Sequence, residues 1–91
     1  MADLGRYFLS GSRQPLILPE LGMGDAPIVA SLWLVDVGTK VSKGDRLLEV
    51  LAGVATVDLP SPISGVLVET LVAEDDPLAV GQILGVIAAE E

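Results

Sequence analysis

From Pro15 onward the chain alternates between short apolar runs and turn residues. The runs are rich in Val, Ile and Leu, and several alternate apolar with polar positions, as half-buried β-strands do. No segment keeps the helical spacing of apolar residues over three turns. The pattern predicts strands at 16–18, 27–34, 46–51, 54–59, 65–72 and 83–88, and very short strands around Val41 and Leu78. The predicted fold class is therefore all-β.

The second half of this pattern repeats the first at a shift of 37 residues, the difference between positions 81 and 44. At this shift Gly44 falls on Gly81 and Val41 on Leu78. Each half is too short to bury its own apolar face, so the halves should pack on one another. We expect a flattened β-barrel or sandwich of two four-stranded antiparallel sheets with quasi-two-fold symmetry, a barrel-sandwich hybrid. Further pairs at this shift are Val35 with Val72, Leu47 with Leu84 and Val50 with Ile87.

The alternation within the strands also predicts which side chains face the core. In an extended strand every second residue lies on the same face of the sheet. The predicted core residues are Leu32, Leu34, Leu48, Val50, Val57, Leu59, Val66, Val68, Leu84 and Val86.

The segment that joins the two halves is a candidate functional element. A glycine, Gly53, separates two apolar strand runs there, which is typical of a tight hairpin. The symmetry places this hairpin at one end of the sandwich and the chain termini near the other. Residues 1–14 lack the strand pattern and are interpreted as a flexible leader, with Tyr7 and Phe8 available to dock, before a domain at 15–91.

Composition excludes several classes of function. The chain has no Cys and no His, which excludes disulfides, the usual zinc sites and Ser-His or Cys-His nucleophiles. Five basic residues against thirteen acidic ones give a net charge of −8, which repels the phosphates of nucleic acids. No apolar run approaches the roughly 18 residues of a membrane-spanning helix. We expect a cytoplasmic monomer that binds neither nucleic acid nor membrane.

Two motifs suggest chemistry but fail on their spacing. Glu74-Asp75-Asp76 crowds three carboxylates, yet it matches no EF-hand loop, so no metal site is expected. Gly22-Met23-Gly24 is rich in glycine but lacks the helix and the lysine of a phosphate-binding loop.

Five stretches of the sequence combine spaced glycines with a Pro-Ser-Pro turn. The stretches are Leu18-Pro19-Glu20-Leu21-Gly22, Trp33-Leu34-Val35 with Gly38 and Val41, Gly44-Asp45 with Leu47-Leu48-Glu49-Val50, Ala55-Thr56-Val57-Asp58-Leu59-Pro60-Ser61-Pro62-Ile63-Ser64-Gly65, and Val80-Gly81-Gln82-Ile83-Leu84-Gly85-Val86-Ile87. Through these stretches the chain resembles, over about residues 15–88, the lipoyl domains of dihydrolipoamide acyltransferases from 2-oxo acid dehydrogenase complexes, with biotinyl domains as close relatives. The opening stretch and Trp33 favour the lipoyl branch.

The resemblance implies a cofactor site that this sequence departs from. In the family the hairpin reads Glu-Thr-Asp-Lys-Ala, and its lysine carries lipoate through an amide bond. The same five positions here are Leu51, Ala52, Gly53, Val54 and Ala55. Because Val54 has no amine to acylate, we expect no attached lipoate and no other cofactor. The two lysines, Lys40 and Lys43, precede Gly44 and are interpreted as solvated surface charges.

Two functions stay open at this point. The first is a lipoyl-like structural or docking module that is not lipoylated and accompanies dehydrogenase-complex subunits. The second is a lipoate-bearing, swinging-arm acyl carrier that uses Lys40 or Lys43. An enzyme in its own right is excluded because no catalytic set can be assembled and because the family's acyltransferase core is a separate, larger domain.

The acidic loops give the docking hypothesis its chemistry. Carboxylates cluster at Glu74-Asp75-Asp76 and around Asp36, Asp45 and Glu49, in predicted loops or strand edges. Such a surface predicts weak, salt-sensitive binding to a basic protein partner, although solubility alone also explains the charge.

Overall fold

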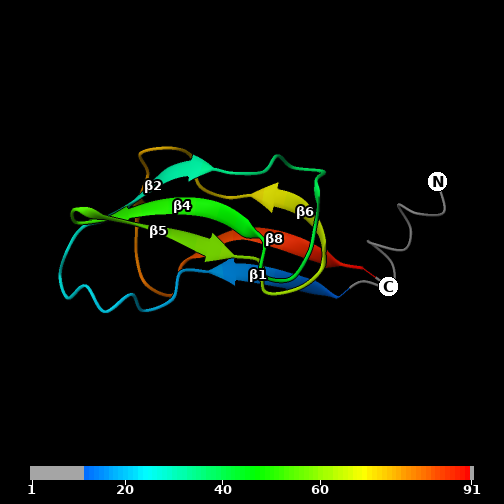
Figure 1. The fold of residues 1–91 in the computed structure, drawn as a ribbon, viewed down its shortest axis with the longest axis horizontal. Helices are drawn as coiled ribbons and strands as arrows, with labels where there is room; N and C mark the ends of the chain where they lie inside the picture. The colour runs from blue at the N-terminus through cyan, green and yellow to red at the C-terminus, as the bar shows by residue number, and fades with distance from the viewer. Residues whose placement is uncertain (1–11, 91) are drawn as a thin grey trace.

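The computed structural model describes residues 12–90, which form eight strands and no helix (Figure 1). The strands are β1 (Arg13–Ile17), β2 (Ile28–Trp33), β3 (Lys40–Val41), β4 (Arg46–Ala52), β5 (Ala55–Pro60), β6 (Gly65–Thr70), β7 (Pro77–Leu78) and β8 (Ile83–Ala89). They make two antiparallel four-stranded sheets, with strand orders β1-β8-β6-β3 and β5-β4-β2-β7. The predicted class and layering are confirmed. Strand β1 begins at Arg13, three residues before the predicted start, and residues 1–11 of the predicted leader lie outside the described part.

The 37-residue repeat extends from the strand order to individual hydrogen bonds. Replacing β1, β8, β6 and β3 by β5, β4, β2 and β7 turns one sheet into the other. The Ala30 amide donates to the Asp76 carbonyl at 2.9 Å, and at the equivalent place the Leu67 amide donates to the Thr39 carbonyl at 3.1 Å. The loops before β3 and β7 therefore pair with the neighbouring sheet strand in the same way, whatever side chains they carry.

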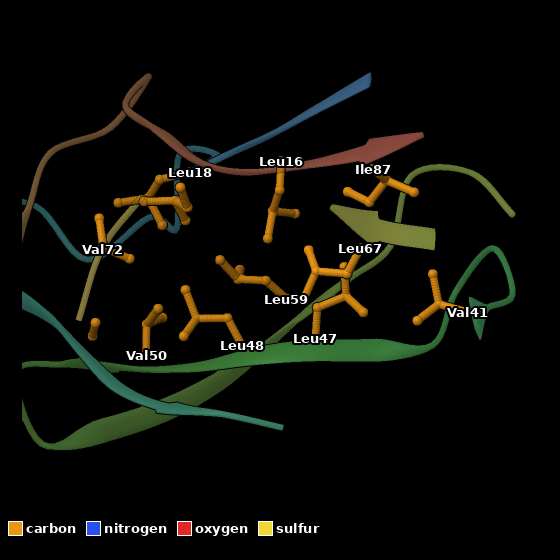
Figure 2. Close-up of a cluster of buried hydrophobic side chains, with 12 residues drawn as sticks. Leu16, Leu18, Val41, Leu47, Leu48, Val50, Leu59, Leu67, Val72 and Ile87 are labelled. Carbon is orange, nitrogen blue, oxygen red and sulfur yellow. The ribbon is translucent and has the colours of Figure 1, made fainter. Parts of the chain in front are cut away.

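The core lies between the two sheets and consists almost wholly of Leu, Val and Ile (Figure 2). Of the predicted core residues, Leu48, Val50, Leu59 and Leu84 are buried, and Val57 packs against them. The buried cluster comprises Leu16, Leu18, Ala30, Val41, Leu47, Leu48, Val50, Leu59, Leu67, Val72, Leu84 and Ile87.

The prediction was wrong for β2, where Leu32 and Leu34 are exposed. Ala30 is buried, but the pairing of β2 with β4 skips Ser31, which makes a bulge. A bulge inserts one extra residue, so the alternation beyond it reverses and the next even-numbered side chains point outward.

The prediction was also wrong in β6, where the facing is off by one residue already before a bulge, and for Val86 in β8, where a bulge shifts it. Val66 and Val68 are half-buried, and Leu67 between them is the fully buried residue. The pairing of β6 with β8 skips Val68, at the position that the repeat relates to Ser31. In β8 the pairing with β1 skips Leu84, so beyond it Ile87 is buried while Val86 is only half-buried.

Prolines occupy three of the four strands that border the sheets. Pro15 lies in β1, Pro60 in β5 and Pro77 in β7. The Ser12 carbonyl and the Leu18 amide form hydrogen bonds on the side of β8. Backbone polar groups alternate in direction along a strand, and Pro15 is three residues from each, so its backbone nitrogen faces the open edge. A proline there offers no N–H to an incoming strand, which protects the edge against further pairing.

The close packing of β6 on β8 yields a stability prediction. A Cβ atom at Gly65 would collide with the Ala88 carbonyl oxygen, whereas a Cβ at Gly44 would meet nothing within 4 Å. We expect Gly65→Ala to lower the free energy of unfolding by about 3 kcal/mol through overpacking. Gly44→Ala should cost only about 1 kcal/mol, from its left-handed φ of 93°. Urea denaturation followed by circular dichroism would measure both, and equal losses would contradict the packing argument.

Candidate functional site

The β4–β5 hairpin forms one end of the sandwich (Figure 1). Ala52 pairs with Ala55, which leaves Gly53 and Val54 as a two-residue loop. Gly53 has a positive φ of 63° and Val54 does not, the pattern of a type II′ turn with glycine in its first central position. The predicted tight hairpin is therefore confirmed.

The loop that leads into β2 packs against the hairpin and fixes its position. The Gly53 amide donates to the Pro27 carbonyl at 3.0 Å, and a Cβ at Gly53 would lie 3.4 Å from the Cβ of Ala26. Ala52 is fully buried, while the Val54 side chain is fully exposed. Val54 thus projects into solvent from a hairpin whose Gly53 is fixed by the preceding loop. The sequence did not predict the role of Ala26 and Pro27 in fixing it.

The remaining residues of the predicted site differ in how exposed their side chains are. Leu51 is exposed, and its backbone pairs with Val29 on one side and Thr56 on the other. Ala55 is half-buried. The tip is therefore small and apolar, and none of its five residues carries a nucleophile, an acid or a base.

Both lysines lie at the opposite end of the sandwich. Lys40, in β3, forms an ion pair with Glu90 at 2.7 Å, one residue beyond the end of β8. Lys43 is in the following turn, where its amide donates to the Ser64 hydroxyl at 2.9 Å. The Glu90 amide also donates to the Ser64 carbonyl. Lys40 and Lys43 therefore lie together at the end of the sandwich where strand β8 ends.

Two carboxylates of the predicted acidic clusters serve to close turns. An Asp45 oxygen accepts from the Ser42 amide at 2.8 Å, and an Asp76 oxygen accepts from the Ala73 amide at 2.8 Å. Glu49 lies in the inner strand β4, not at an edge or in a loop, and accepts from the Ser31 hydroxyl. Among residues 12–90 no three such side chains are arranged to hold a metal ion.

A shallow groove of about 510 Å³ runs between the edge strands β1 and β5. Four prolines, Pro15, Pro19, Pro60 and Pro62, and one charged residue, Lys43, are among its lining residues. Ser61 also lines the groove, but it is buried and its hydroxyl donates to the Ile63 carbonyl at 2.7 Å. The groove therefore lacks a paired nucleophile and base.

The fold and its projecting hairpin define the class of the protein, a lipoyl-type domain. A solution structure of the lipoyl domain of the 2-oxoglutarate dehydrogenase complex from Azotobacter vinelandii superimposes with a TM-score of 0.60. The match covers 88% of this chain and 95% of that domain, at 20% sequence identity. No helix within residues 12–90 is long and apolar enough to cross a membrane.

Residues 14–87 match the profile of the biotin/lipoyl family, described as "Biotin-requiring enzyme". The chain belongs to this family. It is 35% identical, over 82% of its length, to the dihydrolipoyllysine-residue acetyltransferase component of a pyruvate dehydrogenase complex from Corynebacterium glutamicum. It is 31% identical, over 85%, to the lipoamide acyltransferase component of a branched-chain α-keto acid dehydrogenase complex from Bacillus subtilis. The chain spans 11% and 18% of those two relatives, and as a lipoyl-type domain it is itself non-catalytic.

The geometry of the hairpin predicts that its two loop residues respond differently to substitution. Gly53→Ala should lower the free energy of unfolding by about 1 kcal/mol, because its positive φ disfavours a Cβ. Val54→Lys should change it by less than about 0.5 kcal/mol, because the side chain is fully exposed. Urea titrations of the two variants would test this, and a larger loss for Val54→Lys would contradict the geometry described above.

Proposed function

We propose that the domain carries no lipoate and serves as a structural or docking module beside subunits of a 2-oxo acid dehydrogenase complex. One observation carries the proposal. Val54, which the resemblance aligns with the acceptor lysine, is the residue that projects from the hairpin tip, and its side chain has no amine. The surroundings support it, since Leu51, Ala52 and Gly53 replace the polar residues expected there.

The placement of the two lysines argues against the alternative of a lipoate-bearing carrier. Lys40 and Lys43 lie at the end of the sandwich opposite the hairpin, and Lys40 is paired with Glu90. Modification of either lysine would require a ligase to recognise a short strand or a glycine turn in place of a projecting hairpin. An arm attached there would also point away from the end at which the family's geometry presents it.

The charge distribution favours a basic protein surface as the partner. All four basic residues of the described part, Arg13, Lys40, Lys43 and Arg46, lie at the end opposite the hairpin. The charged residues in the loops at the hairpin end are all acidic: Glu20, Asp25, Glu74, Asp75 and Asp76. A charge gradient of this kind orients an approaching partner and raises its association rate more than its final affinity. We place this encounter in the cytoplasm, with a dehydrogenase-complex subunit.

The cofactor proposal predicts an unmodified protein. Co-expression with lipoate ligase and lipoate, or with biotin ligase and biotin, should leave the intact mass unchanged because no amine stands at the tip. Val54→Lys should be modified only in part, and the quadruple variant Leu51→Glu, Ala52→Thr, Gly53→Asp, Val54→Lys should be modified further. A lipoylated peptide containing Lys40 or Lys43 would overturn the proposal, and the double variant Lys40→Arg, Lys43→Arg is the control for it.

The docking proposal predicts weak binding that depends on salt. NMR titration with the subunits encoded by neighbouring genes should give chemical-shift changes at low ionic strength that fade at high ionic strength, because exposed charges are screened within about 10 Å at 0.1 M salt. Absence of shifts at low salt, or binding that is undiminished at high salt, would show that electrostatic docking is wrong.

A further inference from the structure

Three exposed apolar side chains lie side by side on the outer face of the β1-β8-β6-β3 sheet. Ile17 in β1 pairs with Ile83 in β8, and the amide of Leu71, just beyond β6, donates to the Leu84 carbonyl at 2.9 Å. Their exposed fractions are 46%, 47% and 49%. The chain neighbours that point into the core are Leu16, Leu18, Val72 and Leu84, all buried. Ile17, Ile83 and Leu71 therefore point outward and form what we call the apolar row.

The pseudo-symmetry supplies an internal comparison for this row. The 37-residue shift relates Ile83 to Arg46 and the nearby, half-exposed Val80 to Lys43. The first half of the chain therefore has basic side chains at positions where the second half has apolar ones, on the same backbone geometry. The fold therefore does not require an apolar residue at position 83 or 80, although Leu34, the counterpart of Leu71, is apolar and exposed as well. A contiguous exposed apolar patch that packing does not explain is a feature of binding surfaces.

Three exposed acidic residues lie within three positions of the apolar row along the chain, while the basic Lys43 lines the same groove as Ile17. Glu69 precedes Leu71 by two residues and is exposed on the same face of β6. Glu20 follows Ile17 by three residues, and Glu74 follows Leu71 by three. An apolar centre with an anionic rim is complementary to an apolar segment with basic flanks.

The spacing of the row matches one face of an α-helix. Three neighbouring strands about 4.8 Å apart place the outer two side chains about 10 Å apart. On a helix, residues i and i+7 are about 10.5 Å apart along the axis and lie on the same apolar stripe with i+3 and i+4. A helix laid across the three strands can therefore contact all three side chains.

Two other occupants are disfavoured by the structure. A second copy of the chain would bring two acidic rims together, each on a molecule with a net charge of −8. A strand added to the neighbouring sheet edge would meet Pro15, which offers no N–H there.

We propose that the apolar row and its acidic rim form the docking site for a basic amphipathic helix of a partner protein. The inference rests on the docking function proposed above and specifies its surface and the chemistry of its partner. The hairpin tip takes no part in this contact, because it belongs to the other sheet.

The test uses the full chain and a synthetic helical probe peptide, with Leu at i, i+3, i+4 and i+7 and Lys on both flanks. An NMR titration should give shifts centred on the apolar row. Ile83→Arg, which installs the residue found at its symmetric counterpart, should weaken binding roughly tenfold or more, as expected for the centre of a small interface. Leu71→Ser should also weaken it, whereas Leu34→Ser, its symmetric counterpart in the other half, should not.

Two control peptides separate shape from charge. A peptide of the same composition with its sequence scrambled to remove the stripe should bind at least tenfold more weakly, and so should one with Glu in place of Lys. Equal binding by the scrambled peptide, or unchanged affinity in Ile83→Arg, would overturn the proposal. Self-association that Ile83→Arg abolishes would also overturn it, by making the row a dimer contact. Tighter peptide binding after deletion of residues 1–11 would overturn it as well, since the chain's own segment would then occupy the row.

The failure of this inference can be told apart from the failure of the proposed function. If the neighbouring subunits still bind Ile83→Arg in a salt-dependent manner, the docking function stands and only this surface is rejected. If a lipoylated Lys40 or Lys43 is found, the proposed function fails, whatever the peptide titration shows.

Discussion

The burial of one half-domain's apolar face by the other is the constraint on which the structure depends. Each half contributes strands to both sheets, so neither half has a core until the other is in place. The same requirement fixes the crossing between the halves, because the chain must pass from β4 to β5 at one end while β1 begins and β8 ends at the other. The projecting hairpin is thus a consequence of the symmetric packing, and any residue at position 54 is displayed by it.

The strands and the hairpin could be predicted from the sequence because apolar alternation and glycine report directly on local geometry. The facing of side chains in β2 and β8 could not, since neither Ser31 nor Leu84 carries a signal that distinguishes a bulge from a regular strand residue. In β6 every residue from Val66 to Val68 is apolar, so the sequence does not show which of them faces the core. The contact of Gly53 with Ala26 and Pro27 could not be predicted either, because only the folded chain brings these residues together. At the tip itself, the identity of Val54 came from the sequence and its full exposure from the structure.

The acidic residues show why composition alone gives an incomplete account of a surface. The carboxylates of Asp45 and Asp76 accept backbone hydrogen bonds that close turns. A carboxylate oxygen of Asp58 lies 3.7 Å from a guanidinium nitrogen of Arg46, so several of the carboxylates have structural partners. The net charge of the chain is nevertheless unevenly spread, because the basic residues gather at one end. The repeat already contained this information, since Lys43 and Arg46 fall on Val80 and Ile83 at the same shift that aligns the glycines.

Where a repeat keeps its backbone and changes its surface, the differences between the halves mark what folding does not require. Both halves share the glycine turn at Gly44 and Gly81 and the bulges at Ser31 and Val68. Position 75 departs from this pattern mildly, with Asp75 in the left-handed conformation that Gly38 adopts in the first half. At positions 80 and 83 the departure is chemical: basic side chains in one half are apolar ones in the other, on an equivalent turn and an equivalent strand. Folding accounts for the strands that carry those side chains and leaves the side chains themselves to be explained by what they contact outside the domain.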